Sequence, residues 1–68
     1  MKLYRLLTGP DDAAFCHRVT AALNKGWQLH APPTLSYNVQ TAQMYAGQAI
    51  VKDADGKEYH PDLKLSEQ

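Results

Sequence analysis

Three stretches of the chain carry the alternating pattern of apolar and polar residues that is typical of β-strands. In the first stretch, residues 2–8, Leu3 and Leu7 share one face. Tyr4 and Leu6 share the other face, so both faces carry apolar groups. This pattern suits a strand that is covered on both sides, although a run of seven residues is also compatible with a helical segment.

An amphipathic helix is predicted between residues 8–12 and about Lys25. Proline and aspartate are favoured in the first helical turn, and Thr8, Gly9 or Asp11 could serve as the N-cap. Gly26 supplies the left-handed residue that commonly follows a helix. The predicted core stripe consists of Phe15, Cys16, Val19, Ala22 and Leu23.

Two further strand stretches follow the predicted helix. The alternation in residues 27–31 directs Trp27, Leu29 and Ala31 to the core, and it resumes in residues 34–40.

Pro32 and Pro33 interrupt the second stretch, and they indicate a bend or an edge strand because they remove two backbone donors. A reversal at residues 40–42 leads into the last strand, residues 43–52, which is largely apolar on both faces. Gly47 marks a bulge or a point of close packing in it.

The order β-α-β-β predicts a small α+β domain with one helix on one face of a three-stranded or four-stranded, mostly antiparallel sheet. A right-handed crossover through the helix makes the first two strands parallel, with the last strand antiparallel between them. One helix covers only one face of the sheet, and therefore the apolar second face favours a homodimer or a larger homo-oligomer. The alternative is ordinary exposed apolar surface.

The apolar pattern ends near residue 53. Residues 1–53 are expected to form the single compact domain, and residues 54–68 are expected to form a tail that makes a short hairpin return or is disordered. Charge divides in the same way, because five basic and two acidic residues give residues 1–52 a net +3. Residues 53–68 carry two basic and five acidic residues, a net −3.

A chain of 68 residues is one domain of marginal stability, and such small domains usually need a disulfide, a metal or a partner subunit. Cys16 is the only cysteine, so no disulfide can form within the chain and association is the remaining route. The sequence contains no apolar run of membrane-spanning length and no signal-peptide pattern. A free thiol without an export signal favours the cytoplasm.

Three runs of the chain form a distinctive set: YRLLTGPDD at residues 4–12, LNKGWQLH at residues 23–30 and GQAIVK at residues 47–52. Together they resemble the small bacterial proteins grouped as domain-of-unknown-function family 1737. The resemblance covers roughly residues 2–53, and its most specific part is Leu-Asn-x-Gly-Trp-x-Leu. It implies no assigned reaction, cofactor or catalytic residue.

No residue pattern indicates catalysis, a metal or another cofactor, so the sequence favours a protein that is not an enzyme. Cys16 and His17 are neighbours on the helix and point about 100° apart, so they do not form a nucleophile and base. The three histidines lack the spacing of metal ligands. The run from Asp53 to Gly56 matches only part of a calcium loop and is interpreted as a turn.

The leading hypothesis is a non-catalytic, self-associating protein-interaction module that binds itself or another protein. Its candidate contact residues are Tyr4, Leu6, Tyr45 and Gln48. The alternative is a small-molecule or weak enzymatic site between subunits that uses His30, Tyr37 or Gln48. A third hypothesis is nucleic-acid binding by the +3 body, although a neutral chain without a basic strand argues against it.

Overall fold

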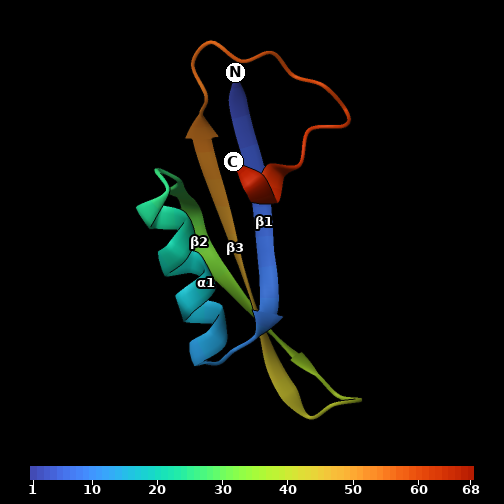
Figure 1. Cartoon of the computed structure of the whole chain (residues 1–68). Coiled ribbons are helices and arrows are strands. Elements are labelled where there is room, and N and C mark those ends of the chain that lie inside the picture. Colours follow the sequence, from blue (N-terminus) through green and yellow to red (C-terminus); the bar gives the residue numbers. More distant parts are fainter.

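The computed structural model describes residues 1–68, in which three strands form one sheet and a single α-helix packs against it (Figure 1). The elements in chain order are β1 (Lys2–Pro10), α1 (Ala13–Asn24), β2 (Gln28–Asn38), β3 (Gln43–Asp53) and a short 3-10 helix, η1 (Leu65–Glu67). The strand order is β1-β3-β2, and β3 runs antiparallel to both neighbours. The α+β class, the single helix layer and the predicted strand order are therefore confirmed, and the sheet has three strands.

The core lies between the sheet and α1. The register pairs Leu3 with Lys52 and Leu7 with Gln48, so these side chains share the face that the helix covers. Ile50 has no exposed surface at the centre of this face. The buried apolar cluster consists of Leu3, Leu7, Phe15, Ala22, Trp27, Ala46 and Ile50.

Asp12 is the N-cap of α1, because its side chain accepts a hydrogen bond of 3.0 Å from the backbone N–H of Phe15. The prediction that Thr8, Gly9 or Asp11 caps the helix was therefore wrong, and Pro10 ends β1 instead of opening the helix. Gly26 has a φ of 97°, which confirms the predicted left-handed residue after the helix.

The buried stripe of α1 is narrower than the sequence pattern. Phe15 and Ala22 are buried, seven positions apart, and Val19 between them is partly buried. Cys16 is exposed and Leu23 is 39% exposed, so the assignment of these two residues to the core was wrong. Helix α1 contacts the sheet mainly at β1. Cys16 lies about 100° around the helix from the buried Phe15, so its side chain is turned away from this contact.

Strand β2 is an edge strand, as the two prolines indicated, and its pairing with β3 bulges at these prolines. The register with β3 shifts between His30 and Thr34, and Ala31 has a φ of 66°. Trp27 is buried as predicted, but Leu29 is 55% exposed and Ala31 is exposed as well, so their assignment to the core was wrong. The helix lies over β1, at the other edge of the sheet, and does not reach them.

The segment after β3 turns at residues 55–56 and returns across β1 to end in η1 (Figure 1). Its backbone is tied to the start of the chain by a hydrogen bond of 2.7 Å from Ala54 N–H to the Met1 carbonyl. Leu63 and Leu65 pack against the buried cluster, and the Lys52 ammonium donates to the Gln68 carbonyl at 2.6 Å. The segment thus lies on the same side of the sheet as α1.

Candidate functional site

The sheet face opposite α1 is uncovered, because the helix and the C-terminal segment both pack on the other face. We call it the open face. The register pairs Tyr4 with Val51 and Leu6 with Ala49, which places these four side chains together on it. Tyr4 is 54% exposed and Leu6 is 56% exposed. Tyr45, which pairs with Pro10, lies further along the same face of β3. An apolar strip therefore runs along β1 and β3, interrupted where Thr8 pairs with Gly47.

Gly47 lies on the open face, where β2 approaches β3 closely. A Cβ atom at Gly47 would lie 2.7 Å from the Thr34 hydroxyl oxygen. The Thr34 hydroxyl donates to the Gly47 carbonyl at 3.5 Å. The predicted close packing at Gly47 is confirmed, and it keeps this part of the open face free of a protruding side chain on β3.

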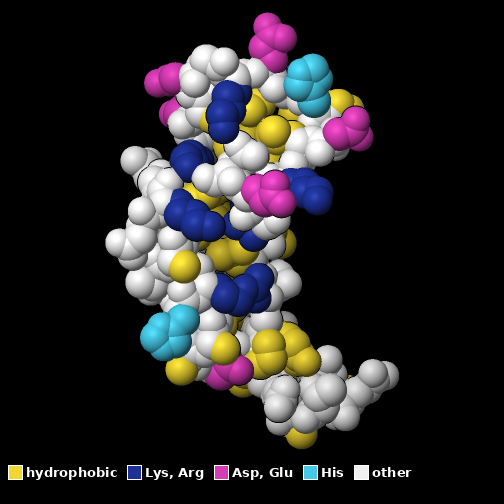
Figure 2. All heavy atoms as spheres, in the orientation of Figure 1, with side chains coloured by type: hydrophobic (Ala, Val, Ile, Leu, Met, Phe, Trp, Pro, Cys, Tyr) yellow, Lys and Arg dark blue, Asp and Glu magenta, His cyan; other side chains and the backbone are white.

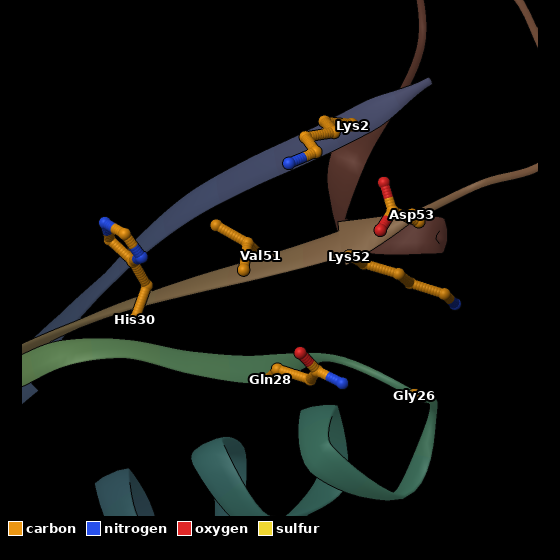
Figure 3. A pocket seen from close by; sticks show the side chains of 7 residues that line it. All are labelled: Lys2, Gly26, Gln28, His30, Val51, Lys52 and Asp53. Carbon is orange, nitrogen blue, oxygen red and sulfur yellow. The ribbon is translucent and has the colours of Figure 1, made fainter.

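A polar pocket of about 550 Å³ occupies the end of the open face near the start of β1. Figure 3 shows Lys2 on β1, Val51 and Asp53 on β3, and Gln28 and His30 on β2 directed to this side of the sheet. Val51 is its one hydrophobic lining residue, whereas pockets that enclose small molecules have mainly apolar walls. The pocket is suited to polar contacts at the rim of an interface.

The open face carries three of the four predicted contact residues, Tyr4, Leu6 and Tyr45. Gln48 lies on the helix face of β3 and is only 5% exposed. Of the second predicted set, His30 lines the polar pocket. Tyr37 pairs with Met44 on the helix side and is 59% exposed. Within one chain His30, Tyr37 and Gln48 therefore form no common site.

The sequence analysis assigned Lys2, Gln28 and Asp53 to no site, and these residues also line the polar pocket. One sequence feature could have indicated them, because each is a polar residue at the end of a largely apolar strand. Lys2 and Asp53 are direct cross-strand partners. The pairing could be found only once the register of β1 with β3 was known.

Gln48 lies opposite the bulge in β2 and has a structural role there. Its side-chain amide donates to the backbone carbonyls of Ala31 at 3.1 Å, His30 at 3.4 Å and Ala49 at 2.9 Å. The bulge takes residues 31–33 out of the regular pairing with β3, so their backbone groups lack strand partners. The amide of Gln48 replaces part of that pairing, which explains a polar side chain on the buried face.

The variant Gln48→Leu is expected to lower the free energy of unfolding by about 1 to 3 kcal/mol, because the partly buried carbonyls of His30, Ala31 and Ala49 lose their donor. Urea denaturation followed by far-ultraviolet circular dichroism measures this change. Gln40→Leu, in the exposed turn between β2 and β3, is the control and is expected to change stability by less than about 0.5 kcal/mol. Equal effects of the two variants would contradict the structural role of Gln48.

The chain thus defines a small α+β domain whose sheet is covered on one face and open on the other. It belongs to the family described as Domain of unknown function (DUF1737), whose family model matches residues 1–53 of the 68 residues. This confirms the family indicated by the three sequence runs. No curated protein and no solved structure matched the chain.

No helix is long and apolar enough to cross a membrane, and no three His, Cys, Asp or Glu side chains are grouped to hold a metal ion.

Proposed function

We propose that this domain is a self-associating, non-catalytic protein-interaction module and that its first partner is a second copy of the same chain, bound through the open face. The side chains of the apolar strip, chiefly tyrosine, leucine, alanine and valine, contribute buried area. We assign this face no reaction. A domain with one free thiol fits a reducing compartment, and the proposal places it in the cytoplasm.

The amount of exposed surface carries this proposal. A compact monomer of 7.6 kDa exposes about 4,300 Å², whereas this chain exposes 5077 Å². The excess of about 800 Å² matches the area that each partner contributes to a standard protein–protein interface. Only 9 of 68 residues are buried, so association would supply burial that the monomer lacks.

The shape of the chain agrees with the excess area. Its radius of gyration is 13.6 Å, whereas a compact domain of this length has a value of about 11 Å. The turn between β2 and β3 projects beyond α1 (Figure 1). Two copies related by a two-fold axis would stack their open faces about 10 Å apart, as in a β-sandwich. Tyr4, Leu6 and Tyr45 of each copy would then fill the space between the sheets.

The test is the mass in solution, measured by light scattering on a sizing column over a roughly tenfold range of micromolar protein concentration. The expected mass approaches about twice the chain mass of 7.6 kDa and falls toward the monomer on dilution. A mass of one chain at every concentration would overturn the proposal.

A further inference from the structure

A groove of about 160 Å³ lies between α1 and β1, on the side of the sheet away from the open face. Arg5 and Leu7 of β1 form one wall. The other wall comes from α1. The residues that line the groove are Arg5, Leu7, Arg18, Ala21, Ala22 and Lys25. Three of these six side chains are cations, and none is an acid.

Helix geometry explains why Arg18 and Lys25 line the same side of the groove. Arg18, Ala21, Ala22 and Lys25 follow the spacing i, i+3, i+4 and i+7, which places them along one line of the helix surface. Arg18 and Lys25 are thereby about 10 Å apart along the helix axis. The two alanines between them have only methyl side chains, so the groove stays open and the longer cationic side chains can bend over it.

Two of the cations are held in place by other groups. The Arg5 guanidinium lies 5.7 Å from the centroid of the Trp27 ring, and Arg5 is only partly exposed. Arg18 Nη1 donates to the Thr8 carbonyl at 2.9 Å, which fixes its guanidinium beside β1. The remaining guanidinium N–H groups are available to an acceptor in the groove.

Few carboxylates offset the charge around the groove. Figure 2 shows Lys and Arg side chains along the middle of the molecule, beside α1, whereas most Asp and Glu side chains lie around the C-terminal segment. Lys52 adds a further cation 5.9 Å from the centroid of the Trp27 ring. Clustered like charges raise the free energy of the folded chain, and a bound anion relieves this repulsion.

We propose that this groove binds the phosphate group of a small phosphorylated molecule. Arginine matches phosphate oxygens with paired N–H donors, and lysine adds a mobile charge. The volume of about 160 Å³ is below the range of pockets that enclose whole small molecules, so only the phosphate enters and the rest of the ligand stays outside. The groove adjoins the C-terminal half of α1, where the helix dipole disfavours anions. Binding therefore depends on the three side chains and is expected in the millimolar range.

The experiment is a titration of ¹⁵N-labelled full-length chain followed by NMR, at constant ionic strength with chloride as the balancing anion. The probes are inorganic phosphate, adenosine monophosphate, adenosine, and a single-stranded RNA decamer. Phosphate and adenosine monophosphate are expected to shift the signals of Arg5, Arg18 and Lys25, and adenosine to shift none of them. RNA binding without binding of phosphate or adenosine monophosphate would overturn the proposal in favour of an extended polyanion.

Two matched variants test whether the groove itself is responsible. Lys25→Gln and Lys64→Gln each remove one exposed lysine charge, the first inside the groove and the second in the C-terminal segment. Lys25→Gln is expected to weaken phosphate binding at least about fivefold, and Lys64→Gln less than about twofold. Equal weakening by the two variants would mean that phosphate responds only to the net charge of the chain, and it would overturn the proposed site. The groove is separate from the open face, so this result does not depend on whether the chain dimerises.

Discussion

Trp27→Ala is expected to remove much of the stability of the folded chain, about 3 to 5 kcal/mol. The Trp27 side chain is 3% exposed and belongs to a core of only seven buried apolar residues. Replacing a buried tryptophan by alanine costs about 3 to 5 kcal/mol. Domains of this length are stable by about 3 to 10 kcal/mol in total, so the loss consumes much or all of that stability. The variant also removes the ring over which Arg5 and Lys52 lie.

Urea denaturation followed by far-ultraviolet circular dichroism measures this loss, at one low protein concentration so that association does not contribute. Tyr59→Ala is the matched control, since Tyr59 is an aromatic residue that is 69% exposed, and it should change stability by less than about 0.5 kcal/mol. Trp27→Phe retains a ring and should cost clearly less than the alanine variant. A cost below about 1 kcal/mol for Trp27→Ala would mean that the core does not depend on this side chain.

The sequence was sufficient to predict the layers and the strand order, because both follow from strong local constraints. The stripe of α1 and Gly26 delimit the helix, and a helix between two strands of one sheet forces a right-handed crossover. The two prolines then identify β2 as an edge strand, so β3 occupies the centre. Each of these steps depends on a local sequence pattern or on backbone chemistry, and none requires knowing which side chains meet in space.

Which face of β3 stays exposed could not be read from its composition. Met44, Ala46 and Ile50 stand on one face, and Tyr45, Ala49 and Val51 stand on the other, so both are apolar. A glutamine on such a strand is ordinarily expected at the surface.

Gln48 is nevertheless buried, because the bulge in β2 presents carbonyls that its amide satisfies. That bulge is a tertiary feature, and the prolines indicate its place but not the acceptors it frees.

The same limit applies to the cationic groove. Residues 1–52 carry a net charge of +3, and this value describes the segment as a whole but not where its cations lie in space. Arg5 and Arg18 come from different elements, and only the packing of α1 on β1 brings them to one groove. The helical spacing of Arg18 and Lys25 was visible in the sequence, and the strand residue that completes the cluster was not.

Leu6→Asp is expected to abolish the dimer while leaving the monomer folded. Leu6 is 56% exposed in one chain, so an aspartate there is solvated in the monomer. In the proposed two-fold dimer both copies of Leu6 enter the interface, and each variant carboxylate would lose its water without gaining a partner. The dimer dissociation constant should rise at least about 100-fold. Sedimentation velocity over the concentration range in which the unmodified chain dimerises measures this change.

Leu35→Asp is the matched control, since it is the same substitution at a leucine that is 59% exposed on the opposite face of the sheet. It should leave the dissociation constant within about threefold, because its carboxylate stays in water in both states. Loss of the dimer only in Leu35→Asp would assign the interface to the helix side of β2, where Leu29, Leu35 and Tyr37 are exposed. Equal loss in both variants would mean that added charge opposes association at any position. A loss of the dimer in Leu6→Asp alone therefore distinguishes a defined interface on the open face from nonspecific association.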